Sequence, residues 1–148
     1  MLRGQTSWAD SIVPLASFET VEQFWEVYSH VVRPEAISSA VDFYLFRDGV
    51  KPMWEDPANA RGGKLVLRLK KGLSTHLWEM VLLAILGEQL DAGEDVCGAV
   101  LGIRNHEDTL AVWNRDADDS EGTRLLSESL SSVLELPSSL RFDYKRHD

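Results

Sequence analysis

The stretch VCGAVLGIRNHEDTLAVW, residues 96–113, decides the fold that we predict for this chain. Its beginning, Val96 to Arg104, and its end, Leu110 to Trp113, are rich in apolar residues and predict two strands. The polar residues 105–109 between them predict a short connection, and two strands joined so closely pair as an antiparallel hairpin. We therefore expect a sheet built from antiparallel neighbours.

The segments on both sides of this hairpin predict the remaining elements. Three further strands are expected at residues 41–46, 64–70 and 140–144. Three helices are expected over residues 20–34, 74–90 and 120–134. Thr20 and Gln23 form a capping-box pattern for the first helix, and Ser74 is expected to cap the second. This order predicts an α+β fold in which helices cover one face of a mainly antiparallel sheet and leave the other face open.

Composition places the chain among ordinary globular proteins. Its 148 residues, 44% of them hydrophobic, are enough for one core, and we expect a single domain over residues 1–148. Cys97 is the only cysteine, so no intramolecular disulfide can form, and a reducing compartment such as the cytoplasm is favoured. The first residues lack the apolar core of a signal peptide. Residues 77–87 are too short for a bilayer span of about 20 residues, so no membrane partner is expected.

Charge and motif spacing exclude several classes of function. The net charge of −9 argues against a general nucleic-acid binder, although it is compatible with reading one terminal nucleotide. The four histidines have no metal-ligand spacing with one another or with Cys97, and residues 61–64 lack the spacing of a phosphate-binding loop. The acidic run at residues 116–119 is better explained as a solvated loop than as a metal cluster. We therefore expect neither a metal, nor a cofactor, nor enzymatic activity.

The run Pro52-Met53-Trp54-Glu55-Asp56 places an aromatic ring beside a carboxylate in a segment without a helix or strand pattern. An indole face attracts a cationic purine by cation–π stacking, which is worth roughly 0.5–2 kcal/mol. A neighbouring Glu can accept two hydrogen bonds from the edge of guanine. The alternative is that Trp54 is a hydrophobic plug at the edge of the core.

The pattern around this run resembles a known family. Seven motifs carry the resemblance: VEQFW at 21–25, DGVKPMWED at 48–56, WE at 78–79, GEQL at 87–90, ED at 107–108, WNR at 113–115 and YKRH at 144–147. Together they resemble the eukaryotic translation initiation factor 4E family, which binds the 7-methylguanosine cap of messenger RNA. Several look closer to the family's class II branch, the 4E homologous proteins and novel cap-binding proteins. The resemblance covers nearly the whole chain.

The resemblance implies a fold and a base-recognition site. The fold is a curved antiparallel sheet with about three helices on its convex face and the cap held on its concave face. The methylated base would stack between Trp8 and Trp54, while Glu55 reads guanine. Class II members often have Tyr where Trp8 stands. Trp113 matches the residue that contacts the methyl group, and a buried core tryptophan is the alternative for this position.

The resemblance also implies where the phosphates of the cap would bind. Arg104 matches a phosphate-binding arginine. Thr109 falls where the standard factor has a phosphate-binding lysine, a loss that class II proteins share and that predicts a weaker hold on the triphosphate. Lys64 and Arg115 are candidate substitutes, with a role as solvated surface residues as the alternative.

A second implied surface binds proteins. Phe24 and Trp25 are adjacent on a helix and point about 100° apart, so one of them is expected to be exposed. In the family, a Tyr-x-x-x-x-Leu-hydrophobic segment of scaffold or repressor proteins docks here. The residues implied in this chain are Val21, Trp25, Glu79, Leu82, Leu83 and Gly87. A fully internal helix pair is the alternative.

Two functions follow from these observations. The first is a non-enzymatic, class II cap-binding protein that represses translation or serves as an alternative initiation factor. The second is an adaptor whose cap pocket is weak or lost and whose helix surface carries the function. Relative to the family, we expect the chain to lack the usual N-terminal His-Pro-Leu segment, which helps to build the peptide-binding surface.

Overall fold

In the computed structural model, the described part of the chain comprises residues 12, 14–31, 33–36, 40–53, 55–87, 89–90 and 95–147. The chain divides into two compact units, residues 1–31 and 32–148.

The first unit contains helix α1 (Val21–Tyr28). Thr20 caps it as predicted, because its Oγ1 accepts a hydrogen bond from the Gln23 amide at 3.1 Å. The Gln23 side chain reaches back and accepts from the Glu19 amide at 2.7 Å. The helix ends at Tyr28, before the predicted end near residue 34. As expected for adjacent helical residues, Phe24 is buried, while Trp25 is 41% exposed.

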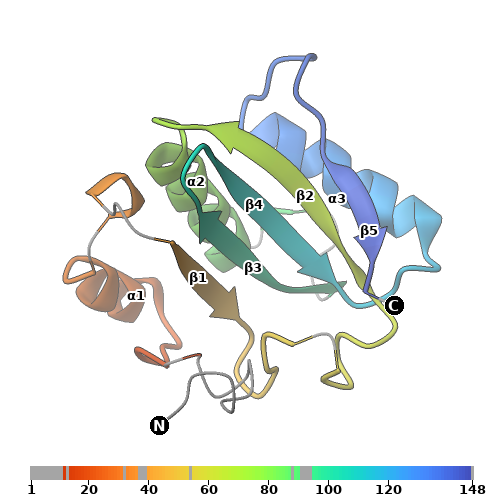
Figure 1. Cartoon of the computed structure of the whole chain (residues 1–148). Helices are drawn as coiled ribbons and strands as arrows, with labels where there is room; N and C mark the ends of the chain where they lie inside the picture. The colour runs from red at the N-terminus through yellow and green to blue at the C-terminus, as the bar shows by residue number, and fades with distance from the viewer. Residues whose placement is uncertain are drawn as a thin grey trace, which may run out of the picture. The chain divides into compact units, whose positions relative to one another are not determined.

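The second unit is built on a five-stranded sheet (Figure 1). Its strands are β1 (Val41–Phe46), β2 (Gly63–Lys70), β3 (Val96–Ile103), β4 (Glu107–Asn114) and β5 (Asp143–Arg146). The order across the sheet is β1-β3-β4-β2-β5, and every neighbouring pair is antiparallel. Helices α2 (Ser74–Leu86) and α3 (Ser120–Val133) lie behind the curved sheet in Figure 1, so the face toward the viewer carries no helix of this unit. The predicted α+β class with an antiparallel sheet is confirmed.

Strand β2 shows how the sequence divides its side chains between the two faces. Leu65, Leu67 and Leu69 are almost completely buried, on the face that α2 and α3 cover. Lys64 and Arg68 point to the opposite, open face, because successive side chains of a strand alternate between faces. On the helical side, apolar residues of α2 and α3 complete the core: Leu77, Trp78, Val81, Leu82, Ala84, Leu126 and Leu130.

Three predicted boundaries were wrong. The hairpin connection is shorter than expected, since β4 already begins at Glu107 and pairs Asp108 with Ile103. The last strand occupies residues 143–146 rather than 140–144, because pairing with β2 sets its limits. Helix α2 ends at Leu86 instead of near residue 90.

The predicted cap of α2 was also wrong. Leu73 is the N-cap and makes no side-chain cap bond, whereas the Ser74 hydroxyl donates to the Asp108 carboxylate. Asp108 is buried on β4 and also accepts from the Lys71 ammonium and, at 3.2 Å, from the Arg104 amide. Burial alone would raise the pKa of Asp108, but the hydrogen bonds from Lys71 and Ser74 outweigh it and lower the pKa. One carboxylate thus joins the start of α2 to the β3–β4 hairpin.

Candidate functional site

The loop that carries Glu55 connects β1 to β2 and is fixed by its own polar side chains. The Asp56 carboxylate accepts hydrogen bonds from the Lys51 and Ala58 amides, each at 2.9 Å. These two bonds lower the pKa of Asp56. Asn59 is fully buried and donates from Nδ2 to the carbonyls of Lys51 and Met53, both at 2.8 Å. The loop is therefore ordered around an exposed Glu55.

Neither Asp56 nor Asn59 was predicted to have this role. An Asx side chain two residues before a turn amide is the local signal that points to Asp56. Asn59 has no such signal, because its partners lie six and eight residues earlier in the loop. The two predicted stacking residues, Trp8 and Trp54, lie outside the described residues.

Trp113 lies on the open face of β4 and is only 8% exposed. Phe46 meets its ring edge-on at a centroid distance of 5.2 Å, and the His147 ring is tilted against it at 4.3 Å. Trp113 belongs to an apolar cluster on this face that we call the open-face cluster: Phe46, Val66, Cys97, Val100, Ala111 and Trp113. Most of the Trp113 surface is therefore buried, as the alternative interpretation of the sequence expected. Packing against its neighbours holds the ring in one orientation.

Cys97 connects the Glu55 loop to this cluster. It sits in the irregular register between Val96 and Gly98 on β3, and its Sγ lies 3.5 Å from the Ala58 carbonyl of the loop. Burial raises the pKa of the Cys97 thiol, and the charges of Arg115 and Arg47 oppose this increase. The loop that presents Glu55 is thus attached at the Trp113 end of the open face.

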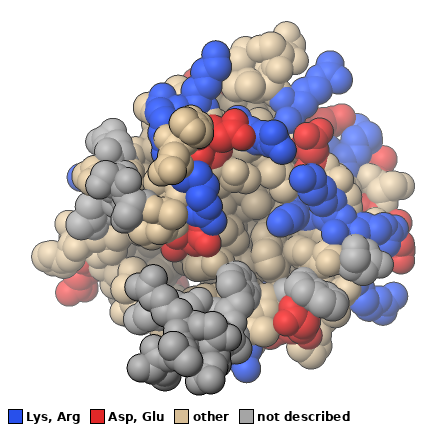
Figure 2. All heavy atoms as spheres, viewed as in Figure 1, with Lys and Arg blue, Asp and Glu red and all other residues tan. Residues whose placement is uncertain are grey.

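Two predicted cations also lie at this end. Lys64 on β2 is the direct partner of Trp113 on β4 and of Lys145 on β5, so all three share one row across the open face. Arg115 immediately follows β4, where its amide donates to the Asp95 carbonyl at 2.8 Å and its side chain is exposed. In Figure 2, blue Lys and Arg side chains gather on the β2 and β5 side of this face around an uncharged centre.

Arg104, the third predicted cation, lies at the other end of the open face. It follows β3 directly after Ile103, the partner of Asp108, and Asp108 is five residues, or about 17 Å, along β4 from Trp113. Its guanidinium forms an ion pair with Asp42 of β1 at 2.8 Å. This pairing was not predicted from the sequence. The structure therefore brings Lys64, Arg115 and Trp113 to one end of the face and places Arg104 at the other.

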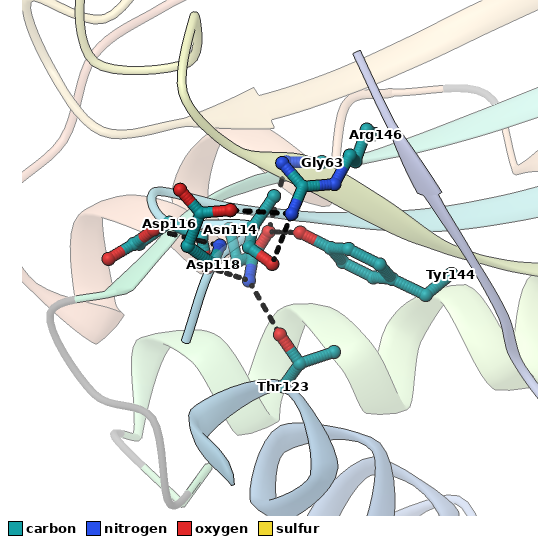
Figure 3. A network of polar contacts seen from close by, with 8 residues as sticks. Gly63, Asn114, Asp116, Asp118, Thr123, Tyr144 and Arg146 are labelled. Carbon is teal, nitrogen blue, oxygen red and sulfur yellow. Dashed lines mark hydrogen bonds and ion pairs between the residues drawn. The ribbon is translucent and has the colours of Figure 1, made fainter. Parts of the chain in front are cut away.

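A buried polar network fixes the strand ends beneath Trp113 and Lys64 (Figure 3). The side-chain carbonyl of Asn114 accepts from the Gly63 amide at 3.1 Å and from the Tyr144 hydroxyl at 2.7 Å. Its amide group donates at 3.3 Å to the Asp116 carbonyl and to the Thr123 hydroxyl. One side chain thus joins β4 to β2, β5 and α3.

The two glycines of the Arg61-Gly62-Gly63-Lys64 motif have a steric explanation at this position. A Cβ on Gly62 would lie 1.9 Å from the Asn114 carbonyl oxygen, and one on Gly63 would lie 2.5 Å from that of Lys145. The absence of side chains at Gly62 and Gly63 therefore lets the start of β2 approach the end of β4 and the end of β5 closely. Arg146 completes the network by pairing with Asp118 in the loop before α3 (Figure 3).

The predicted protein-binding residues fall in both units. On α1, Val21 and Trp25 are exposed, and on α2, Leu83 is 40% exposed. Leu82 is buried, and the half-buried Glu79 pairs with Arg33 at 3.3 Å. Gly87 ends α2, and its amide donates to the Leu83 carbonyl at 2.8 Å.

Within the described residues, no group of three or more His, Cys, Asp and Glu side chains is placed to hold a metal ion. No helix in this part of the chain is long and apolar enough to cross a membrane.

Comparison with known proteins decides the family. The family model for Eukaryotic initiation factor 4E matches residues 2–148. The chain belongs to the eukaryotic initiation factor 4E family. Eukaryotic translation initiation factor 4E-4 of Caenorhabditis elegans is 50% identical over 141 residues, which cover 95% of this chain and 66% of that protein. Eukaryotic translation initiation factor NCBP of Oryza sativa subsp. japonica is 46% identical, with coverage of 96% and 63%.

Solved structures of the 4E family agree with the fold. Ascaris suum eIF4E-3 in complex with the m7G cap superimposes with a TM-score of 0.92 at 36% identity, covering 97% of this chain and 83% of that one. C. elegans eIF4E-3 in complex with the 4E-binding protein Mextli and a cap analog gives 0.93 at 34% identity, with coverage of 99% and 86%. The chain spans slightly less than two thirds of the length of the curated relatives named above.

Proposed function

We propose that this chain binds the 7-methylguanosine cap of messenger RNA. The methylated base stacks between Trp8 and Trp54, and Glu55 accepts hydrogen bonds from the guanine edge. The observation that carries the proposal is the attachment of the Glu55 loop, through Ala58 and Cys97, to the cluster that holds Trp113. This arrangement presents a carboxylate and an immobilised indole at one end of an open sheet face. The complex of the related Ascaris suum eIF4E-3 with the m7G cap supports cap binding as the function.

The cations of the open face fit the charges of the ligand. Lys64 and Arg115 lie at the Trp113 end of the open face, and Arg104 lies at the other end. Cations are therefore present near both ends of β4. Since Thr109 is neutral, the phosphates meet fewer cations here than in the standard factor. We therefore propose a class II role, as a repressor or alternative initiation factor in the cytoplasm. Its relatives named NCBP support this branch.

We also propose that α1 and α2 bind scaffold or repressor proteins through a Tyr-x-x-x-x-Leu-hydrophobic segment. On α1, the exposed Val21 and Trp25 support this proposal, since large apolar side chains exposed on neighbouring turns mark interaction sites. On α2, the exposed Leu83 supports it separately. C. elegans eIF4E-3, a related protein, forms a complex with the 4E-binding protein Mextli, which supports a protein partner for this chain. If the cap pocket were weak, the same exposed residues would favour the adaptor function.

Tryptophan fluorescence tests the cap function directly. We expect saturable quenching by 7-methylguanosine triphosphate and much weaker quenching by GTP, because only the methylated base is cationic. Glu55→Gln should weaken binding of the methylated ligand by about 10- to 100-fold, as expected for loss of a bidentate base contact. Glu128→Gln on the exposed surface of α3 serves as the control and should bind as the wild type does. A folded protein that responds to neither ligand would refute cap binding and leave the adaptor function.

A further inference from the structure

Arg104, the cation implied for phosphate binding, is already engaged by an acidic residue of the same sheet. Its Nη1 lies 2.8 Å from Oδ1 of Asp42 and donates to the Ile103 carbonyl at 2.8 Å. Asp42 lies on β1 opposite Gly102 of β3, and Arg104 follows two residues after Gly102. Strand register therefore creates this pair, and a phosphate that reaches Arg104 meets a guanidinium with one side occupied.

The surroundings of Asp42 favour this arrangement. Gly102 leaves room for it, because a Cβ at that position would lie 3.1 Å from the Asp42 Oδ1 and 3.6 Å from the Arg104 Nη1. The Tyr44 hydroxyl donates to the other carboxylate oxygen at 3.4 Å. Burial and the neighbouring Asp42 charge raise the pKa of Tyr44 to about 12, so the hydroxyl keeps its proton at neutral pH and remains a donor.

The Asp42–Arg104 pair lies at the end of the open face that is remote from Trp113. Register places Asp42, Gly102, Thr109 and Arg68 in one row across the open face. Thr109 contributes no charge to this row, and Arg68 already faces Glu107 at 3.9 Å. Asp42 thus adds a negative charge next to one of the three cations proposed for phosphate binding.

We infer that Asp42 is a specificity-determining residue of the cap site, which reduces the contribution of the cap phosphates by pairing with Arg104. The inference rests on the proposed cap-binding function. A phosphate bound to the remaining guanidinium donors must share the positive charge with Asp42 and is repelled by its carboxylate. Recognition then depends mainly on the methylated base, and a nucleotide with a longer phosphate chain gains little affinity.

The test compares two ligands on two proteins. Binding of 7-methylguanosine and of its 5′-triphosphate is measured by fluorescence titration for the wild type and for Asp42→Asn. Asparagine keeps the shape of the side chain and can still accept from Tyr44, but it lacks the charge. We expect the substitution to tighten triphosphate binding about two- to fivefold, the range over which exposed ion pairs act, and to leave nucleoside binding unchanged.

Two controls separate this effect from a general change in charge. Asp143→Asn removes a negative charge from β5 on the same face, where its partner is Val66 and not Arg104, so it should produce a smaller gain. In an Arg104→Gln background, Asp42→Asn should no longer tighten triphosphate binding, because the cation that it releases is absent.

The outcomes are distinguishable. Unchanged or weaker triphosphate binding by Asp42→Asn, or an equal gain from Asp143→Asn, would overturn the role of Asp42 and leave cap binding intact. A full gain in the Arg104→Gln background would overturn it as well. A folded wild type that binds neither ligand would instead refute the cap function itself, together with this inference.

Discussion

Replacing Asn114 by leucine should show how much the hydrogen bonds of the network in Figure 3 contribute to stability, apart from the packing of this side chain. The two side chains have similar shapes, so the substitution removes hydrogen bonds and leaves little empty space. All four bonding positions of the Asn114 side chain are used, by Gly63, Tyr144, Asp116 and Thr123. The Asn114 side chain is buried, so water does not take its place beside the buried Gly63 amide.

The expected cost follows from which groups stay buried. The Gly63 amide is buried and would lose its partner, which costs about 1–3 kcal/mol. Tyr144 and Thr123 are partly exposed, so each loses only the net value of a hydrogen bond, about 0.5–1.5 kcal/mol. We expect the free energy of unfolding to fall by about 2–6 kcal/mol in total. For a chain of this size, the melting temperature should drop by roughly 6–20 °C.

Urea unfolding followed by circular dichroism measures this change, with the slope of the transition checked for constancy. Asn105→Leu is the matched control, because Asn105 is exposed in the β3–β4 connection and should change stability by less than about 0.5 kcal/mol. Tyr144→Phe, which removes the Tyr144–Asn114 bond and keeps the rest of the Asn114 network, should fall between the two. A loss below about 1 kcal/mol for Asn114→Leu, with an unchanged slope, would refute the assignment of this network as a main connection between strand ends.

Two further predictions concern Asp108 and Gly62. The pKa of Asp108 is lowered in the folded protein, so its stabilising effect is complete above the unfolded pKa of about 3.9 and is lost as the pH falls through the folded pKa. Asp108→Asn should therefore reduce stability at pH 7, and the difference from the wild type should shrink on acidification; a constant difference in urea unfolding across pH would contradict this. Gly62→Ala should cost about 3 kcal/mol or more, because its Cβ would meet backbone at 1.9 Å. Gly72→Ala, at a φ of +98° in open space, should cost about 1–2 kcal/mol, and equal melting temperatures for the two variants would count against the steric argument.

Local patterns predicted the elements well wherever the signal lies within one turn or one strand. Alternation in residues 64–70 predicted β2 to within one residue, and the Thr20–Gln23 pattern predicted the start of α1. The predictions were wrong where a distant residue decides. Ser74 bonds Asp108 instead of capping its helix, and the last strand is limited by its pairing with β2.

The candidate site shows the same division. The motifs predicted Lys64 and Trp113 as members of one site, and strand pairing places them directly opposite each other. They did not predict His147 against Trp113, or Asp42 against Arg104, because these partners are far apart in the chain and meet only through the register of the sheet. Asn114 was visible in the WNR motif, but its four bonds depend on three other elements and the loop after its own strand.

The sequence by itself determined the family, the antiparallel class of the sheet and the faces of its strands, because motifs and side-chain periodicity are properties of contiguous residues. The tertiary structure decided which cation is paired, which carboxylate is buried and how tightly Trp113 is held. These are properties of contacts between strands and helices, and a shift of one residue in register would exchange every side chain on the open face for its neighbour on the helical face.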